Sequence, residues 1–449
     1  MQLLSKVRKI KNLLANGKIT ISVYGLGHVG ASVAAVWLRA GAKVIGVDKL
    51  DSVVKAASSG NSFISEPGVI SALKKALREK RFTATTDAVQ ASKESDFKVI
   101  TVPVGLVGNT ADLSAVEDVA NSIAMGLKKG DLVSLNPTVP PGTTEEFLLP
   151  ILERKSDLIR ERDFGLIYSP ERVYEGRALK DIEENYPAIV AGVGPRSLAA
   201  GAALYSLVCK KGVIRMSSIK AAETEKSFEG IYRDVNIALA NELAKICERL
   251  GIDYWEVRQA ANSQPYSNLH KPGTGVGGAC IPLYPQFIMD VAAKVKASTD
   301  ITSLAREINS LMPKYCVQKA LSLLNRNQSA NPRVTILGLA FRGGVSDTRF
   351  SPSYDVIQEL LNAGCRVTVH DPYVKNDHNL PESVTLTNKL DEALSDADLI
   401  IVATDHPEYA RINPKRLRAN AAIYDGRGIL DRSRFGNILF SGIGREVIS

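Results

Sequence analysis

A glycine-rich turn near the start of the chain has the spacing of a dinucleotide-binding loop. Gly25, Gly27 and Gly30 follow a short β-forming run and open a helix-forming run. Glycines at these positions permit a tight turn, let backbone N–H groups approach a pyrophosphate, and allow the helix to pack closely on the strand. The alternative is a glycine-rich turn in a domain that has lost its ligand. The residues of the turn predicted to contact a cofactor are Gly25, Gly27, His28, Val29 and Gly30.

Asp48 indicates which dinucleotide the turn would accept. It ends the next β-forming run, eighteen residues after Gly30. A carboxylate there can accept hydrogen bonds from both ribose hydroxyls and would repel a 2′-phosphate. The sequence therefore predicts NAD as the cofactor, in preference to NADP.

Four glycines precede Cys280 in the segment LHKPGTGVGGACIP, residues 269–282. Glycines would let a ligand approach the backbone closely and would place the thiol at the rim of a pocket. A free thiol has a pKa of roughly 8.5 and needs a nearby cation or helix terminus to become a good nucleophile. The spacing alone fits a nucleophile and an inert buried cysteine equally well.

The other cysteines fall in helical or strand patterns and are expected to be packing residues. The chain has no CxxC and no His/Cys cluster at metal-ligand spacing, so no metal is predicted. Sparse cysteines, odd in number, indicate a reducing compartment, and we expect a cytoplasmic protein. These cysteines are Cys209, Cys247, Cys316 and Cys365.

Two polar segments follow β-forming runs, at the edge of the sheet where α/β proteins collect ligands. Thr138 in NPTVPPGTT, residues 136–144, could hydrogen-bond a cofactor amide or simply cap a helix. An acid beside an arginine, as in SPERVYEG, residues 169–176, is more often a surface ion pair than a functional pair. The candidates in this second segment are Glu171, Arg172 and Glu175.

The elements that would position these residues form three successive patterns. Short β runs alternate with helical stretches in the first half, which is typical of a parallel doubly wound sheet. Between about residues 217 and 312 the β runs disappear, and residues 219–250 predict one long helix. After residue 332 the alternation resumes, without a GxGxxG after its first strand. The predicted α/β fold has two Rossmann-like doubly wound parallel sheets joined by a central helical domain.

The predicted helix at 219–250 carries an apolar stripe and a set of polar residues. Lys226, Arg233 and Asn236 lie roughly on one face, and solvated surface is the default interpretation of such residues. The stripe consists of Ile231, Val235, Leu239, Leu243, Ile246 and Leu250. The predicted divisions of the chain are a basic amphipathic segment at 1–18, a cofactor domain at 19–215, the helical domain at 216–325 and a second α/β domain at 326–449.

Charge and hydropathy exclude other classes of protein. Of the formal net charge of +8, the first eighteen residues carry +5, so no nucleic-acid face is expected on the folded domains. That basic segment is expected to pack as a helix on the body of the protein, with contact to a membrane surface as the alternative. Residues 19–38 contain no Asp, Glu, Lys or Arg, but their glycine spacing argues against a membrane span.

Taken in order, the motifs resemble those of the UDP-glucose/GDP-mannose dehydrogenase family over residues 19–445. The matching segments are GLGHVG with Asp48, FISEPG, TVPPGT, SPERV, EKSFEGIYRDVNIALANELA, HKPGTGVGGACIP, AREIN with MP, and LGLAFRGGVSDTRFSP. SPERV and YRDVNIALANEL are most similar to the UDP-N-acetyl-D-mannosamine dehydrogenase branch. The resemblance implies an NAD domain, a helical middle that forms a homodimer, a C-terminal domain for the UDP moiety, and a role in polysaccharide biosynthesis.

The resemblance also implies a reaction: oxidation of C6 of a UDP-hexose by NAD, twice, from alcohol through a retained aldehyde to a carboxylate. Cys280 matches the nucleophile, Lys226 the lysine that steadies the oxyanion, and Glu171 the acid assigned to water activation. Thr138 and Glu175 match residues beside the nicotinamide, and Arg349 matches a cofactor-contacting arginine. The implied substrate contacts are Arg172, Val173, Lys226, Arg233, Gly277, Phe341 and Arg342.

The sequence departs from the family pattern at several of these positions. Tyr284 replaces an Asp four residues after the cysteine, and Gly230 replaces an Asn four residues after the lysine. In the family, both positions are associated with the second oxidation, from aldehyde to carboxylate. Tyr284 either donates its hydroxyl near the oxyanion or serves only in packing. Ala279 replaces a His or Tyr, Tyr266 a substrate-binding Arg, and Val104 a cofactor-side Thr.

Three functions are therefore weighed. The favoured one is a four-electron UDP-sugar 6-dehydrogenase acting on UDP-N-acetyl-D-mannosamine, with UDP-glucose or UDP-N-acetylglucosamine as alternatives. A two-electron dehydrogenase of the 6-phosphogluconate or β-hydroxyacid type would need neither Cys280 nor a third domain. A nucleotide-sugar sensor that binds without turnover is suggested by Tyr284 and Gly230, and opposed by the retention of Cys280, Lys226 and Glu171 together.

Overall fold

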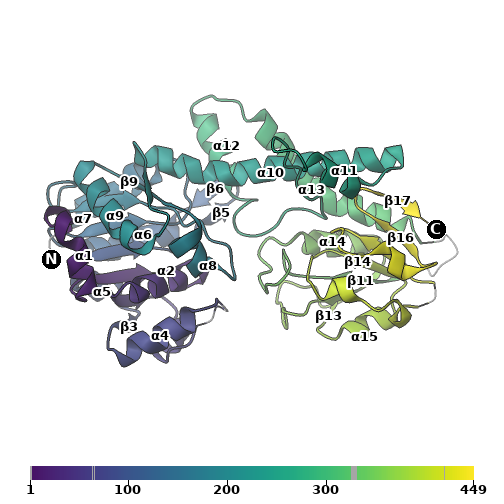
Figure 1. The fold of residues 1–449 in the computed structure, drawn as a ribbon, viewed down its shortest axis with the longest axis horizontal. Helices are drawn as coiled ribbons and strands as arrows, with labels where there is room; N and C mark the ends of the chain where they lie inside the picture. Colours follow the sequence, from purple (N-terminus) through teal and green to yellow (C-terminus); the bar gives the residue numbers. More distant parts are fainter. Residues whose placement is uncertain (1–2, 63, 65, 325–330, 419, 449) are drawn as a thin grey trace. The chain divides into compact units, whose positions relative to one another are not determined.

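A computed structural model describes the whole chain except residues 1–2, 63, 65, 325–330, 419 and 449. The chain divides into two compact units, residues 1–228 and 229–449, which are coloured along the sequence in Figure 1. Each unit contains one large sheet covered by helices.

The first unit is built on an eight-stranded sheet with the order β10-β9-β8-β7-β4-β1-β2-β3. The strand order reverses at β1, so β2 lies on one side of it and β4 on the other. Its strands are β1 (Thr20–Tyr24), β2 (Lys43–Val47), β3 (Phe82–Thr85), β4 (Phe97–Ile100), β7 (Leu132–Leu135), β8 (Gly165–Tyr168), β9 (Ala188–Gly192) and β10 (Val213–Arg215). A separate hairpin consists of β5 (Gly105–Val107) and β6 (Thr110–Asp112).

One pair of strands departs from the otherwise parallel arrangement of this sheet. β9 pairs antiparallel with β8, and β10 then runs parallel to β9. The apolar run of β9 has the same pattern in either direction, so the sequence did not reveal its reversal. The other neighbouring strands pair in parallel, as expected for a doubly wound fold.

Helices cover both faces of the first sheet (Figure 1), which explains why its central strands are buried along their length. One face packs on α2 (His28–Arg39), α3 (Asp51–Ser58), α4 (Val69–Arg78) and α9 (Pro195–Val208). The other packs on α5 (Ala88–Glu94), α6 (Ser114–Gly126) and α7 (Leu149–Ser156). Shorter turns are η3 (Thr143–Leu148), α8 (Ala178–Lys180) and η4 (Asp181–Asn185).

The N-terminal segment packs on the body of the first unit, as expected. It forms η1 (Leu3–Ser5), η2 (Val7–Lys9) and α1 (Ile10–Ala15), which lie beside α9. Its apolar side chains are buried in the same core as α2. They are therefore not available as a membrane-binding face, and the alternative interpretation of this segment is not supported.

The long helix α10 spans Ile219–Leu250, the limits that its sequence predicted. Its second half shares a core with α11 (Tyr254–Ala261), α13 (Asp300–Leu321) and the second sheet. α12 (Tyr284–Lys294) completes the helical region. The compact units divide inside α10, and the finer division at 18, 215 and 325 remains a prediction.

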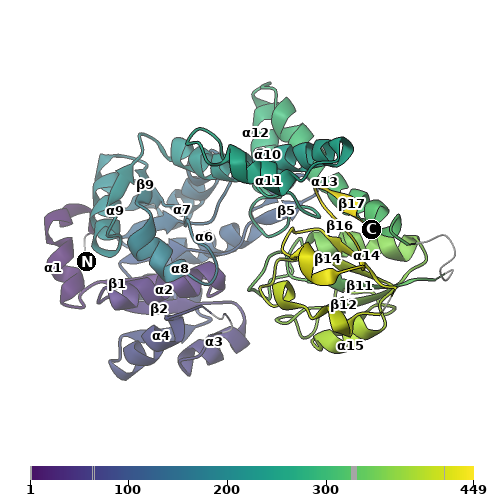
Figure 2. The ribbon, with the colours of Figure 1, turned by 45° about the vertical axis from the view of Figure 1, so that its right-hand side comes forward.

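The second unit contains a seven-stranded sheet with the order β13-β12-β11-β14-β15-β16-β17, parallel except for the last pair. α13 and α14 (Pro352–Asn362) cover one face and α15 (Leu390–Ser395) the other (Figure 2). Its strands are β11 (Arg333–Leu337), β12 (Arg366–His370), β13 (Thr385–Thr387), β14 (Leu399–Val402), β15 (Ala422–Asp425), β16 (Leu439–Gly442) and β17 (Arg445–Ile448). Single turns are η5 (Tyr409–Arg411), η6 (Pro414–Arg416) and η7 (Arg432–Phe435).

No helix within the described part of the chain combines the length and hydrophobicity needed to cross a bilayer.

Candidate active site

The glycine-rich turn connects β1 to α2 and is shaped by steric need at two of its glycines. Gly25 has a φ of +91°, which other residues rarely adopt. A Cβ at Gly30 would lie 1.7 Å from the carbonyl oxygen of Gly25, so the helix can approach the turn only with glycine there. Among the described residues, no atom lies within 4 Å of a Cβ placed at Gly27. The protein therefore leaves open space at Gly27, where a pyrophosphate would approach, and the turn fits NAD.

Asp48 lies at the end of β2, and its carboxylate accepts hydrogen bonds from the backbone of the glycine turn and of the loop that follows β2. One carboxylate oxygen accepts a hydrogen bond from the N–H of Leu26 at 2.8 Å, and the other accepts from the N–H of Leu50 at 3.0 Å. The hydroxyl of Thr101 donates to the carbonyl oxygens of Tyr24 and Gly25 from the next strand, β4. The turn is thus fixed from both neighbouring strands at the point where the strand order reverses, the usual nucleotide position in such sheets.

Substituting Asp48 with alanine should reduce the preference for NAD over NADP. The carboxylate can accept ribose hydroxyls and repels a 2′-phosphate, so its loss should raise the KM for NAD by about tenfold or more while leaving the KM for NADP equal or lower. Initial rates with both cofactors measure the ratio. Equal turnover with NADP in the unmodified protein would contradict the assignment of Asp48.

A buried carboxylate, Glu66, positions the loop that carries Glu175. Its two oxygens accept hydrogen bonds from the backbone N–H groups of Gly176 and Ala178, both at 2.7 Å. Glu175 then lies 3.4 Å from Nδ1 of His28, at the first turn of α2. The structure thus brings Glu175 to the cofactor turn, next to a residue predicted to contact the cofactor.

Glu171 lies at the ends of β7 and β8 in a network of buried polar groups. The side-chain amide of Asn136 donates to Glu171 at 2.9 Å and to the Tyr205 hydroxyl at 3.0 Å, while Ser134 donates to Asn136 at 2.6 Å. Burial raises the pKa of Glu171 to about 7, against the opposing effects of the Asn136 hydrogen bond and the Lys226 charge. A carboxylate with this pKa can accept a proton near neutral pH.

Another buried carboxylate, Glu223, ties the loop containing Thr138 to α10. It accepts hydrogen bonds from the N–H of Gly142 at 2.5 Å, and from the N–H and hydroxyl of Thr144 at 2.8 and 2.6 Å. Burial raises the pKa of Glu223 to about 7. Because Glu223 precedes Lys226 by three residues in the same helix, it fixes this loop beside the helical turn that carries the lysine.

In the second unit, the loop with Phe341 and Arg342 follows β11, where the strand order of that sheet reverses. Asp371, at the end of β12, accepts hydrogen bonds from the N–H groups of Leu339 and Ala340 at 2.8 and 2.9 Å. Thr404, after β14, donates to the carbonyl oxygen of Ala340 at 2.6 Å. These contacts repeat the arrangement around the glycine turn of the first sheet.

Two more residues hold the same loop. Asp405 accepts from the N–H of Gly343 at 2.9 Å, and Nδ1 of His406 accepts from the N–H of Gly344 at 3.2 Å. The proton of a neutral His406 is then on Nε2, which donates to Asp371 at 3.1 Å. Burial alone would raise the pKa of Asp371, but the hydrogen bonds from His406 and the backbone hold it below its usual value.

Two of the glycines before Cys280 pack closely against other parts of the protein. A Cβ at Gly277 would lie 2.8 Å from Cβ of Phe341, and one at Gly278 would lie 2.8 Å from the Phe341 ring. The N–H of Gly278 donates to the carbonyl oxygen of Arg349 at 3.0 Å. The structure thus brings together three residues that the sequence assigned to ligand binding: Gly277, Phe341 and Arg349.

Cys280 itself is exposed, whereas the other four cysteines are buried, as predicted. Its carbonyl oxygen accepts hydrogen bonds from the N–H groups of Leu283 and Tyr284, both at 3.1 Å, immediately before α12. An exposed thiol is open to a reaction partner, whereas an inert packing cysteine is shielded in a core. The packing alternative for Cys280 is therefore not supported.

The remaining residues that the sequence assigned to ligand binding lie in separate loops and on α10. The guanidinium of Arg172 lies 5.5 Å from the Tyr186 ring centroid, and Val173 beside it is partly buried. Arg349 contacts Asp347 at 2.5 Å in its own loop. Arg233 is exposed on α10, and Tyr266 is 96% exposed.

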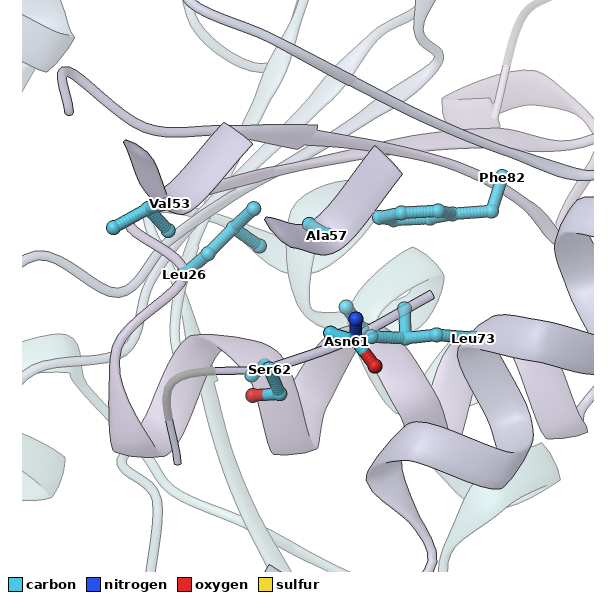
Figure 3. A pocket seen from close by; sticks show the side chains of 9 residues that line it. Leu26, Val53, Ala57, Asn61, Ser62, Leu73 and Phe82 are labelled. Atoms are coloured by element: carbon cyan, nitrogen blue, oxygen red, sulfur yellow. The ribbon is translucent and has the colours of Figure 1, made fainter. Parts of the chain in front are cut away.

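A small hollow that opens to solvent lies behind the glycine turn (Figure 3). Leu26 of the turn contributes to its wall together with α2, α3, α4 and β3. Its lining is mostly apolar and contains none of the predicted catalytic residues, so it supports the turn and is not the reaction site. The lining residues are Leu26, Ala31, Ala34, Val53, Ala57, Asn61, Ser62, Leu73 and Phe82.

Comparison with known proteins assigns a family along most of the chain. Residues 19–208, 220–311 and 335–432 match the NAD binding, central and UDP binding domains of the UDP-glucose/GDP-mannose dehydrogenase family. A UDP-N-acetyl-D-mannosamine dehydrogenase of Pyrococcus horikoshii is 34% identical over 95% of this chain and 99% of that protein. An NDP-N-acetyl-D-galactosaminuronic acid dehydrogenase of Ralstonia nicotianae is 34% identical over 92% and 97%.

A solved structure of the UDP-D-ManNAc dehydrogenase from Pyrococcus horikoshii superposes with a TM-score of 0.87 at 33% identity, covering 95% of this chain and 99% of that one. The matched domains coincide with the glycine turn, the long helix and the second sheet described above. The chain therefore belongs to the UDP-glucose/GDP-mannose dehydrogenase family and is an NAD-dependent UDP-sugar dehydrogenase.

Proposed function

We propose that the protein oxidises C6 of a UDP-hexose by four electrons to the uronate, with UDP-N-acetyl-D-mannosamine as the favoured substrate. The observation that carries the proposal is the exposed Cys280 in the turn before α12, because a two-electron dehydrogenase needs no thiol. The N-acetylated sugars named for the similar proteins support the choice of sugar. UDP-glucose and UDP-N-acetylglucosamine remain alternatives.

In the proposed mechanism, each side chain has a separate task. NAD supplies a hydride acceptor for each of the two oxidations. In the first oxidation, the C6 hydroxyl proton passes to solvent water, the C6–H bond breaks as the hydride leaves, and the C=O bond of the aldehyde forms. Lys226 stabilises the negative charge on the C6 oxygen during this step. The Cys280 thiolate then adds to the C6 aldehyde, forming a C–S bond and an alkoxide, and loss of a second hydride leaves a thioester.

Hydrolysis of that thioester completes the reaction. Glu171 takes a proton from water as the water oxygen attacks C6. The C–S bond breaks, the Cys280 thiolate leaves, and the carboxylate product is released. Thr138 and Glu175 are proposed to orient the nicotinamide. Arg172, Val173, Arg233, Gly277, Phe341 and Arg342 are proposed to hold the substrate, and Arg349 to contact the cofactor.

The number of NADH molecules formed from a limiting amount of each UDP-hexose tests this function. Two NADH per sugar and a carboxylate product, identified by mass analysis, are expected for the preferred substrate. One NADH with a released aldehyde or ketone would favour the two-electron dehydrogenase. No NADH from any UDP-hexose, despite binding, would favour the sensor.

Turnover should increase with pH through about 7 if Glu171 is the base. Its pKa is raised to about 7 by burial, so the proton-accepting form predominates only above that pH. Glu171→Gln should slow carboxylate formation by about 10²-fold or more and remove this limb of the pH–rate profile. An unchanged limb in Glu171→Gln would assign the titration to another group.

The raised pKa of Glu171 also predicts how the free energy of unfolding changes with pH. The folded protein holds the Glu171 proton more tightly than the unfolded chain does, so stability should decrease as pH rises from about 4.5 to about 7. Glu171→Gln should reduce this decrease in melting experiments. Glu223 contributes in the same direction and is unaffected by that substitution.

We also propose a homodimer formed through the central helices. Tyr232, Leu239, Ile246 and Leu250 on α10 are 43–66% exposed, although they are large and apolar. Their spacing of four and seven residues places them along one helical stripe. Such an exposed stripe is typical of a protein interface.

Ile246→Glu should weaken the dimer because it buries a charge in that interface. Sedimentation velocity at micromolar concentration should show more monomer for this variant than for the parent. Lys375→Glu, an exposed residue outside the helices, provides a control. A parent protein that sediments as a monomer would contradict the dimer.

A cytoplasmic location is proposed on the basis of the thiols: all five cysteines are free, as expected in a reducing compartment.

A further inference from the structure

Gly230 occupies an unusual position, inside the 32-residue helix α10 and buried. Glycine in a helix interior lowers helix stability relative to alanine, so a buried one needs a reason in packing. Tyr284 supplies that reason. A Cβ at Gly230 would lie 2.5 Å from Cδ2 of the Tyr284 ring and 3.0 and 3.1 Å from its Cβ and Cγ. The ring therefore rests directly on the backbone of α10.

Tyr284 is also tied to Cys280. It begins α12, and its N–H donates to the carbonyl oxygen of Cys280 at 3.1 Å. Its ring lies 6.2 Å from the ring of the buried Phe287, centroid to centroid, which holds it from within α12. Tyr284 therefore makes both contacts: its side chain packs on α10, and its backbone N–H bonds to Cys280. A displacement of the ring would therefore be transmitted to the turn that carries the thiol.

The ring of Tyr284 can occupy this place only when residue 230 has no side chain. The two residues are therefore coupled, and a substitution at either one should alter the effect of a substitution at the other.

We propose that Tyr284, seated on Gly230, is a positioning residue that fixes the Cys280 turn against α10. The aromatic ring performs this task through packing. The proposal rests on the proposed role of Cys280 as the nucleophile, and it assigns to the ring the orientation of that thiol.

A double-substitution cycle tests the proposal on the full-length protein, using Gly230→Ala, Tyr284→Ala and the pair together. The first readout is the rate at which iodoacetamide alkylates Cys280, followed by mass spectrometry of the peptide. Cys280 is the exposed thiol and the other four are buried, so the signal is specific. This measurement needs neither substrate nor cofactor. It therefore remains interpretable even if no UDP-hexose is oxidised, which would count against the proposed function alone.

When Tyr284 is present, the methyl group that Gly230→Ala introduces must displace the tyrosine ring. Gly230→Ala should change the alkylation rate by about threefold or more and lower kcat by about tenfold, with little effect on the KM for the UDP-sugar. In the Tyr284→Ala background, the same substitution should change neither rate. The melting temperature should show opposite signs: Gly230→Ala lowers it when the ring is present and raises it when the ring is absent, because alanine favours the helix.

Tyr284→Phe completes the test, because it keeps the ring and removes the hydroxyl. It should alkylate at the rate of the parent protein. If Tyr284→Phe instead resembles Tyr284→Ala, the hydroxyl carries the effect and the proposal is wrong. The proposal is likewise overturned if Gly230→Ala has the same effect on alkylation with and without the ring.

Discussion

Replacing Cys280 with alanine should abolish formation of the carboxylate product and reduce NADH from two per UDP-sugar to at most one. The thiol is needed only after the first hydride has left, because it can add to an aldehyde but not to an alcohol. The first oxidation can therefore continue slowly, whereas the second loses its covalent intermediate. We expect carboxylate formation to fall by at least about 10³-fold, measured by mass analysis of the product under limiting substrate.

A second substitution distinguishes a nucleophile from a residue that only shapes the site. Cys280→Ser can form an ester in place of the thioester, and this ester should hydrolyse poorly and accumulate on the protein with a mass increase corresponding to the sugar nucleotide. Cys247→Ala, at a buried cysteine on α10, controls for general effects of removing a thiol. If Cys280→Ala still yields two NADH and the carboxylate, the covalent mechanism is wrong.

Local sequence patterns predicted those elements whose structure depends on residues close together in the sequence. The place of the glycine turn between β1 and α2, the place of Asp48 at the end of β2 and the limits of α10 agree with the prediction, because spacing within one strand, turn or helix determines them. The β-forming runs recognised in the sequence do not include the short strands β3, β10, β13, β16 and β17. Strands of three or four residues at or near a sheet edge carry too little pattern to be distinguished from a loop.

The residues that hold the site together could not be predicted in this way. Glu66 bonds to a loop 110 residues away, Glu223 to one 81 residues away, and His406 to one 62 residues away. A buried carboxylate that accepts backbone N–H groups leaves no periodic signal, because its partner is chosen by the fold. Only Asp371 had a usable clue: it ends the second strand of its sheet, as Asp48 does in the first.

Substituting Gly30 with alanine should eliminate measurable NAD binding. The new methyl group would lie 1.7 Å from the carbonyl oxygen of Gly25 and 2.6 Å from the hydroxyl of Thr101, so α2 must move away from the turn. Overpacking of this kind typically costs about 1–3 kcal/mol, and here the displaced atoms are those that approach the pyrophosphate. We expect the Kd for NAD, measured by calorimetry, to rise by about 100-fold or more.

Gly27→Ala is the matched control for this prediction, because the same methyl group enters open space. Gly27 has a φ of −71°, which alanine adopts freely, and a Cβ there meets no atom of the part of the chain that the structure describes within 4 Å. The melting temperature should therefore stay close to that of the parent, while the methyl group occupies the space through which the pyrophosphate approaches. Both variants should bind UDP normally, since the UDP binding domain lies at residues 335–432. If Gly27→Ala binds NAD like the parent, the pyrophosphate does not approach the backbone at this glycine, and the role assigned to the turn is wrong.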